Sequence, residues 1–252
     1  MLNHTVRGEG DPVVLLHGGL LNSSMWDAQV ELLAPTHQVI TFDARGHGLS
    51  PTPTEPFSHY EDLLELLDHL GVARASLVGL SQGGRTSIDF AIAHPHRVAK
   101  IVLAGTGISG MTFRDPFVLS YMKKLSEATD IESVVECFLR MWVDGPQRTP
   151  DEVDPAVREP CHAAMSDTIT RHGARWLGLL RELGAIDRVA ELTARTLVLV
   201  GDLDSSDIHT VADLVAGAAP NAHKKVVTGA GHMINLDQPE EFNRVLRRFL
   251  AH

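Results

Sequence analysis

A serine in a glycine-rich turn is the first residue whose surroundings could support chemistry. Ser81 lies in a Gly-x-Ser-x-Gly motif at 79–83, between an uncharged apolar run at 75–79 and a segment at 82–94 with apolar residues three and four positions apart. This pattern predicts a buried strand that runs directly into a helix. Such a joint strains the residue at its apex and turns that side chain outward, and the flanking glycines give it room. Ser81 is therefore a candidate nucleophile, and the alternative is that it only caps the helix.

A serine hydroxyl needs a base beside it, and the base needs a carboxylate to orient it. In an open parallel sheet such groups gather at the carboxyl ends of the strands. His232 follows the last predicted strand in a glycine-rich loop and is the predicted base. Asp202, Asp204 and Asp207 all follow the strand before it. We favour Asp204 because the turn after the strand carries it toward the loop of His232, with Asp207 as second choice and Asp202 as a partner for loop amides.

Two backbone amides are needed to stabilise the oxyanion that forms during acyl transfer. The amide of Gln82, the first residue of the helix after Ser81, is one predicted donor. The other is expected from the His-Gly-Gly loop after an early strand, with the amide of Gly19 preferred and that of Leu20 as the alternative. His17 in this loop, and the polar residues of 43–47, are expected to form structural hydrogen bonds.

These residues require a scaffold of strands that alternate with helices, which is typical of parallel βαβ units. The predicted strands lie at 3–8, 13–16, 38–42, 75–79, 98–104, 196–200 and 223–227. The first predicted helix begins near Ser23 or Ser24. The other predicted helices lie at 58–70, 82–94, 113–128, 131–143, 155–166, 168–183, 208–218 and 239–250.

The alternation stops between 108 and 187, where the sequence shows helical patterns and chain breakers. We interpret this segment as a helical lid that covers Ser81 and supplies an apolar wall. Leu20, Leu21 and Trp142 are the preferred candidates for the substrate pocket. Further apolar side chains of the lid that could form its wall are Phe113, Phe117, Met122, Phe138, Met141, Met165 and Trp176.

Composition limits the partners of this protein. The chain has 252 residues, 44% of them hydrophobic, which is enough for one α/β core with an insertion or for two small domains. Its net charge of -10 opposes binding to a phosphate backbone, so nucleic acid is not an expected partner. The sequence shows neither an apolar stretch of about 18 residues nor a signal-peptide core, so no membrane association is expected. Two cysteines suggest reduced thiols in a cytoplasmic protein.

The order Ser81, Asp204, His232, together with the His-Gly loop, the Arg-Gly-x-Gly-x-Ser motif at 45–50 and the helical insertion, resembles the α/β-hydrolase superfamily. The resemblance is to its esterase, lactonase and haloperoxidase-like branch. It implies a mostly parallel central sheet flanked by helices, with a core of residues 1–107 and 188–252 and a helical cap of residues 108–187, inserted after the strand that ends near Ala104. It also implies an acyl-enzyme on Ser81, hydrolysed by water that His232 activates.

Two departures from the family pattern are visible. The N-terminus lacks room for the further antiparallel strand that relatives often carry, so the sheet edge is expected to be shortened. The loop after the strand at 196–200 lacks the proline that often closes the acid motif in relatives, which leaves Asp207 open as the acid.

The predicted function is a serine hydrolase for a carboxylic ester or lactone of small to medium, largely apolar structure. Two alternatives remain: carbon–carbon bond hydrolase or perhydrolase chemistry on the same triad, and a non-catalytic ligand-binding receptor of this fold. Relatives that cleave carbon–carbon bonds usually carry an extra arginine in the acid-loop motif, and no arginine occurs between 196 and 243. The chemistry implies no metal and no organic cofactor. The expected partner is a small-molecule substrate, and the oligomeric state is open, with a homodimer as one option.

Overall fold

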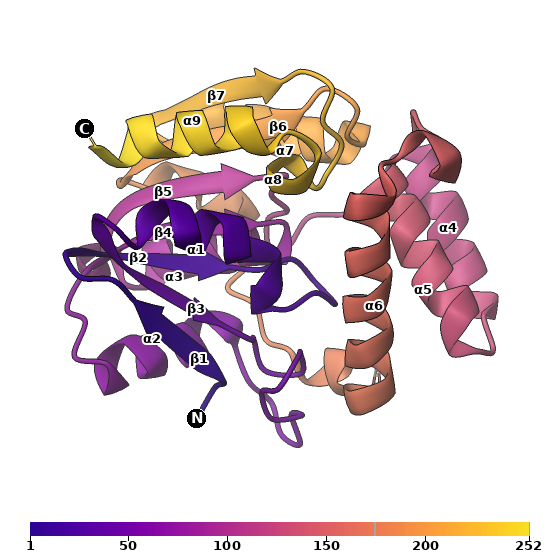
Figure 1. Ribbon diagram of the computed structural model, residues 1–252, viewed down its shortest axis with the longest axis horizontal. Helices are drawn as coiled ribbons and strands as arrows, with labels where there is room; N and C mark the ends of the chain where they lie inside the picture. The colour runs from indigo at the N-terminus through magenta and orange to yellow at the C-terminus, as the bar shows by residue number, and fades with distance from the viewer. Residues whose placement is uncertain (174, 252) are drawn as a thin grey trace.

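The computed structural model describes residues 1–173 and 175–251 and is built on one seven-stranded sheet (Figure 1). The strand order is β1-β3-β2-β4-β5-β6-β7; β1 pairs antiparallel with β3, and every other pair is parallel. The strands are β1 (His4–Arg7), β2 (Asp11–Leu16), β3 (His37–Phe42), β4 (Ala75–Leu80), β5 (Val98–Ala104), β6 (Arg195–Gly201) and β7 (Ala222–Val227). The mostly parallel sheet that the alternating pattern predicted, and that the family resemblance implied, is confirmed.

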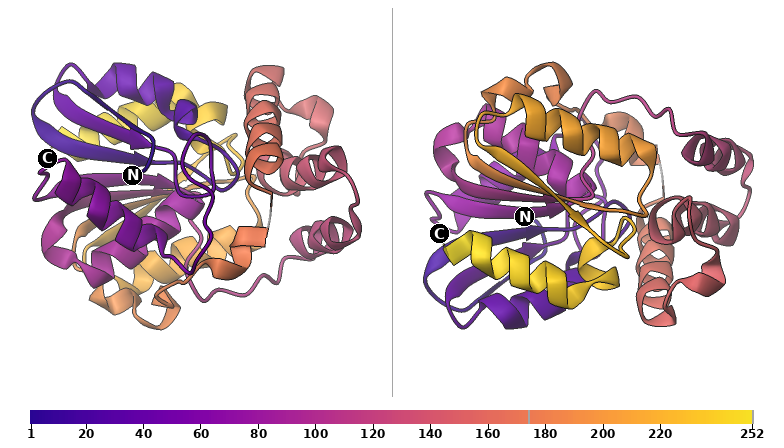
Figure 2. Two further views of the ribbon diagram at one scale, coloured as in Figure 1. Left: turned by 90° about the horizontal axis from the view of Figure 1, so that it is seen from below. Right: turned by 90° about the horizontal axis from the view of Figure 1, so that it is seen from above.

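Helices cover both faces of the sheet (Figure 2). One face carries α1 (Asp27–Leu33) and α9 (Pro239–Ala251), and the other carries α2 (His59–His69), α3 (Gln82–Ala93) and α7 (Ser206–Ala218). Successive side chains of a strand point to opposite faces, which divides the core into two clusters. In β2, Val14 and Leu16 pack with α2, α3 and α7, whereas Val13 and Leu15 pack with α1 and α9. Burial on both faces explains why β2 is an unbroken apolar run.

The chain between β5 and β6 forms helices, and no strand is assigned there among the residues that the structure describes. Its α-helices α4, α5 and α6 lie beyond the carboxyl ends of the strands (Figure 1). We call this segment, residues 105–194, the helical insertion. Its elements are α4 (Pro116–Glu127), α5 (Ile131–Leu139), the π-helix η3 (Arg140–Asp144), η4 (Pro150–Glu152), α6 (Pro155–His172), η5 (Arg175–Leu179), η6 (Ala185–Asp187) and η7 (Val189–Glu191).

Several predicted boundaries differ from the structure. The helix expected at 155–166 continues to His172 as α6, which ends where Gly173 takes a φ of 62°. The helix expected at 168–183 is wrong as a separate element, because its first residues belong to α6 and the 3₁₀ turn η5 lies further along. No residue between 166 and 168 forces a break, whereas glycine in the left-handed region ends helices readily. The helix expected at 131–143 changes at residue 140 into the π-turn η3.

Helix caps account for smaller differences. Asn22, rather than Ser23 or Ser24, caps the 3₁₀ turn η1 (Ser23–Trp26), because its side chain accepts the amide of Ser24. Asp115 caps α4, which begins three residues later than expected. The remaining short helices are η2 (Pro95–Arg97) and α8 (Ile234–Asp237), and α8 was not predicted from the sequence.

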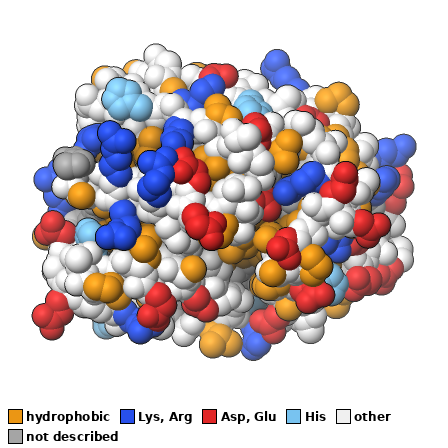
Figure 3. Space-filling model, turned by 45° about the horizontal axis from the view of Figure 1, so that its top comes forward, with side chains coloured by type: hydrophobic (Ala, Val, Ile, Leu, Met, Phe, Trp, Pro, Cys, Tyr) orange, Lys and Arg blue, Asp and Glu red, His pale blue; other side chains and the backbone are white. Residues whose placement is uncertain are grey.

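Acidic, basic and apolar side chains are mixed on the face of the molecule shown in Figure 3. Among the described residues, no helix combines the length and the apolar character that crossing a bilayer requires. The large apolar side chains most exposed to solvent include Leu49 and Leu177, with exposed fractions of 67% and 51%. Leu177 lies in the helical insertion and lines the cavity described below.

Candidate active site

Ser81 occupies the strained turn that the glycine motif predicts. It lies between β4 and α3 with φ 53° and ψ -112°, a conformation that residues other than glycine rarely adopt. A Cβ atom added at Gly79 would lie 2.3 Å from the carbonyl oxygen of Gly83, and one added at Gly83 would lie 2.1 Å from that of Leu16. Ser81 stands at the cap position of α3, but its side chain makes no capping hydrogen bond. The geometry therefore does not support a capping role for this serine.

His232 and Asp204 meet at the carboxyl ends of β7 and β6. The Nδ1 atom of His232 lies 2.8 Å from Oδ2 of Asp204, and both residues are buried, with 1% and 3% exposed. With Nδ1–H donating to the carboxylate, the ring nitrogen Nε2 carries the lone pair that can accept a proton. This Nε2 is buried and has no hydrogen-bond partner in the described part of the chain. Ser81 and His232 line the same cavity, so this cavity is shared by a serine and by the imidazole that Asp204 holds.

The other two candidate carboxylates serve the backbone. Asp207 accepts the amides of Arg114 at 3.0 Å and of Asp115 at 2.9 Å, which attaches the start of the helical insertion to α7. Asp202 accepts the amide of Gly229 at 2.7 Å in the loop before His232. The structure thus places Asp204 against the imidazole and the other two carboxylates against loop amides.

Three amides are available for an oxyanion. Gly19, Leu20 and Gln82 line the cavity with Ser81, and their backbone N–H groups donate no hydrogen bond within the described ranges. Gln82 is the first residue of α3, where the helix dipole adds positive potential. Leu20 takes a φ of 59°, an unusual value for a leucine. Gly19 and Leu20 both remain candidates for the second donor.

His17 supports the loop that carries two of these amides. Its Nδ1 lies 2.8 Å from the carbonyl oxygen of Gly18, and its Nε2 accepts the amide of Ala44 at 2.9 Å. Burial lowers the pKa of His17, which keeps the ring neutral and its Nε2 free to accept. Asp43 accepts amides from two neighbouring loops, and Arg45 forms an ion pair with a carboxylate of α2. These contacts are structural, as expected from the sequence.

Sequence reasoning missed a further buried histidine near Ser81, His59 at the start of α2. Its Nε2 lies 3.3 Å from the side-chain Nε2 of Gln82, the residue that follows Ser81. Burial lowers the pKa of His59 to about 3, and the charges of Arg85 and Arg45 act in the same direction. The pattern of α2 marked its leucines as the buried face, and His59 at its N-terminus gave no comparable signal.

The cavity above Ser81 has a volume of about 420 Å³ and mostly apolar walls. Leu20 and Trp142, predicted for the pocket, both line it, and the Trp142 ring packs 4.9 Å from the imidazole of His232. Leu21, also predicted for the pocket, does not line it: its amide donates to the carbonyl oxygen of Gly18, and its side chain is 1% exposed in the core. The described residues that form the walls are Gly18, Gly19, Leu20, His47, Ser81, Gln82, Arg85, Gly107, Met111, Phe113, Met122, Leu125, Phe138, Met141, Trp142, Trp176, Leu177, Ile208, His232 and Met233.

The helical insertion supplies about half of these walls, as expected from its apolar side chains. Two of the predicted wall residues, Phe117 and Met165, do not reach the cavity. Met165 is 1% exposed and packs on the inner side of α6, and Phe117 packs against Tyr121. Met111 and Ile208 line the cavity although the sequence gave no reason to select them.

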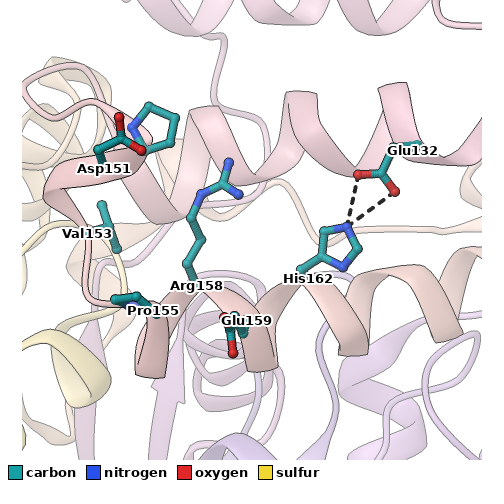
Figure 4. A pocket seen from close by; sticks show the side chains of 8 residues that line it. Glu132, Asp151, Val153, Pro155, Arg158, Glu159 and His162 are labelled. Carbon is teal, nitrogen blue, oxygen red and sulfur yellow. Dashed lines mark hydrogen bonds and ion pairs between the residues drawn. The ribbon is translucent and has the colours of Figure 1, made fainter.

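A second cavity of about 560 Å³ lies in the helical insertion, away from Ser81 and His232. In Figure 4, His162 points from α6 toward Glu132 on α5, with which it forms an ion pair, and Arg158 points into the space between them and Asp151. Among the described residues that line this cavity, His162 and Glu132 form an imidazole–carboxylate pair, but none is a serine, threonine or cysteine that could act as a nucleophile. Among the described residues, no group of three or more histidine, cysteine or acidic side chains is arranged to hold a metal ion.

The chain matches the alpha/beta hydrolase family over residues 13–245, and it belongs to this family. It is 26% identical to the 3-oxoadipate enol-lactonase 2 of Acinetobacter baylyi, over 98% of this chain and 94% of the relative. It is 28% identical to a 2-hydroxy-6-oxononadienedioate/2-hydroxy-6-oxononatrienedioate hydrolase of Paraburkholderia xenovorans, over 100% of this chain and 91% of the relative. The structure resembles that of a hydrolase from Pseudomonas aeruginosa with a TM-score of 0.83 and 29% identity, covering 99% of this chain and 94% of the other.

Proposed function

We propose that this protein is a serine hydrolase that cleaves a carboxylic ester or lactone through an acyl-enzyme on Ser81. The observation that carries the proposal is the 2.8 Å contact between His232 and Asp204 beside the cavity that contains Ser81. An imidazole held in this way by a carboxylate can take the serine proton on Nε2, and the carboxylate stabilises the imidazolium that forms.

The proposed reaction has two halves. The Oγ atom of Ser81 attacks the substrate carbonyl while its proton passes to Nε2 of His232. The oxyanion is stabilised by the amide of Gln82 and that of Gly19 or Leu20. The carbon–oxygen bond of the ester then breaks, and the alkoxide leaves with the proton from His232. Water, deprotonated by His232, attacks the acyl-enzyme and releases the acid, so Ser81 recovers its proton.

The shape of the cavity supports a small or medium apolar substrate. A volume of about 420 Å³ lies at the lower end of the range for small-molecule pockets. Its walls are formed mainly by leucine, methionine, phenylalanine and tryptophan side chains, which favour an apolar acyl or alcohol group. The similarity to an enol-lactonase supports including lactones in the substrate class.

Carbon–carbon bond hydrolysis is the second candidate. It is favoured by the similarity to a hydrolase whose named substrates, an oxononadienedioate and an oxononatrienedioate, are not esters. The absence of an arginine between 196 and 243 in the sequence counts against it. Perhydrolase chemistry would use the same acyl-enzyme, with peroxide in place of water, and a receptor of this fold would bind its ligand without turnover.

Turnover assays distinguish these activities directly. The substrates are p-nitrophenyl acetate and butyrate, simple lactones and a dienedioate. We expect ester or lactone turnover that Ser81→Ala abolishes and that Ser126→Ala, at an exposed serine of α4, leaves unchanged. Turnover of the dienedioate alone would favour carbon–carbon cleavage. No turnover of any substrate, with no labelling of Ser81 by a fluorophosphonate, would contradict the proposal and favour a receptor.

A further inference from the structure

The loop that carries His232 is connected to the helical insertion by an arginine that belongs to no motif in the sequence. The Nη2 atom of Arg148, which follows η3, lies 3.1 Å from Oδ2 of Asp237 at the end of α8. The same Oδ2 accepts the amide of Gly231, the residue before His232, at 2.7 Å. Both charged side chains are largely buried, with 12% and 4% exposed. A buried ion pair between residues 89 positions apart therefore holds the backbone next to His232.

The guanidinium of Arg148 also touches this backbone directly. A Cβ atom added at Gly231 would lie 2.2 Å from its Nη2. Arg148 also donates from Nη2 and Nε to the carbonyl oxygens of 143 and 144, at 2.7 and 3.0 Å respectively. These carbonyls follow Trp142, whose ring packs on the imidazole of His232. One side chain thus fixes both the backbone behind His232 and the segment that covers its ring.

We propose that Arg148 and Asp237 are positioning residues for His232, and this inference rests on the proposed role of His232 as the base. They hold the imidazole where its Nε2 can take the proton of Ser81. A misplacement of about 1 Å in a reacting group can cost about 100-fold in rate. Removing Arg148 would leave Asp237 as a buried carboxylate without its cation, which favours movement of the loop or entry of water.

Arg148→Gln and Asp237→Asn test the proposal, with p-nitrophenyl butyrate as the probe. We expect kcat to fall about 10- to 100-fold while KM stays within about twofold, because the pocket walls are retained. Arg148→Lys should recover part of kcat, since it keeps the charge next to Asp237. Arg158→Gln is the matched control, because Arg158 is a largely buried arginine of the same insertion whose described ion pairs lie within the insertion. We expect its kcat to stay within about threefold of wild type.

The pH dependence supplies a second readout, which reports whether the charges of this pair act on the imidazole of His232. The charged groups facing the His232 loop in the described chain are Asp204 at the ring, Asp202 at the start of the loop, and Asp237 with Arg148. Removal of the Arg148 cation leaves an extra negative charge, which favours the imidazolium and moves the acid limb of kcat/KM to higher pH. Removal of the Asp237 anion moves it to lower pH.

Opposite shifts with a loss of kcat in both variants would support the proposal. Three results would overturn it: a kcat of Arg148→Gln and Asp237→Asn within twofold of wild type, an equal loss of kcat in Arg158→Gln, or acid limbs of the two variants that move in the same direction. If Arg148→Gln does not fold, as judged by circular dichroism, Asp237→Asn and Arg148→Lys decide by the same criteria. Failure of the proposed function looks different: Ser81→Ala would then keep wild-type turnover, whereas failure of the positioning role leaves that variant inactive.

Discussion

The stability of the fold toward acid is predicted to depend on His59, the imidazole beside Gln82. His59 is 7% exposed, its Nδ1 has no hydrogen-bond partner among the described residues, and burial lowers its pKa to about 3. In the unfolded chain a histidine has a pKa of about 6.5. The unfolded chain therefore binds the proton first, so stability is fully present above pH ~6.5 and is lost as the pH falls toward 3.

The size of the effect follows from this difference in pKa. Each pH unit inside the window costs about 1.4 kcal/mol, so a change from pH 7 to pH 5 costs about 2 kcal/mol of unfolding free energy through His59 alone. Burial also lowers the pKa of His17 and His47, which increases the loss for the whole protein. Urea titrations followed by circular dichroism at the two pH values measure the loss.

The variant His59→Gln should show a pH-dependent loss about 2 kcal/mol smaller than that of the wild type, whatever its stability at pH 7. Phe57→Leu is the control, because the Phe57 ring packs 5.1 Å from the ring of His59 but carries no titratable group. Its loss between the two pH values should equal that of the wild type. If His59→Gln and the wild type lose the same free energy, His59 titrates near its unfolded pKa, and the reasoning from burial is wrong.

Three further predictions concern the candidate site. Asp204→Asn should lower kcat for a p-nitrophenyl ester about 10⁴-fold, as removal of the orienting carboxylate does in serine proteases. The kcat of Asp207→Asn should stay within about tenfold of wild type, because Asp207 binds only loop amides. A larger loss of kcat at Asp207 than at Asp204 in steady-state kinetics would reverse the assignment. Gly83→Ala should destabilise the protein by about 3 kcal/mol or more, because the new Cβ would lie 2.1 Å from the carbonyl oxygen of Leu16, and a urea midpoint equal to that of the wild type would show that the turn can shift. Trp142→Ala should raise KM for p-nitrophenyl butyrate about tenfold through lost apolar contact, and unchanged kinetic constants would remove Trp142 from the pocket wall.

The sheet and the strained turn at Ser81 could be predicted from local features of the sequence. An apolar run such as 13–16 is determined by burial on both faces, and a Gly-x-Ser-x-Gly motif between a strand and a helix leaves the chain few other conformations. Asp204 and His232 followed from chain order, because the carboxyl ends of parallel strands lie at one edge of the sheet. These are short-range signals combined with one rule of topology.

Other features depend on contacts that the sequence does not encode locally. The ion pair of Arg148 and Asp237 joins two distant segments and has no pattern in either one. The extent of α6 depended on which residue ends a helix, and that residue is Gly173 rather than one near 167. Leu21 was placed in the pocket by its proximity to Leu20, but Leu21 is fully buried in the core, whereas Leu20 lines the cavity.

Detection of the acyl-enzyme is the most direct test of the central claim, that Ser81 is a nucleophile activated by His232. The protein is mixed with a slowly hydrolysed p-nitrophenyl ester, quenched in acid during turnover, digested and analysed by mass spectrometry. We predict one acyl group on the peptide that contains Ser81, and its absence in His232→Ala. Steady turnover with no acyl group on that peptide, or with the group on another residue, would contradict the claim.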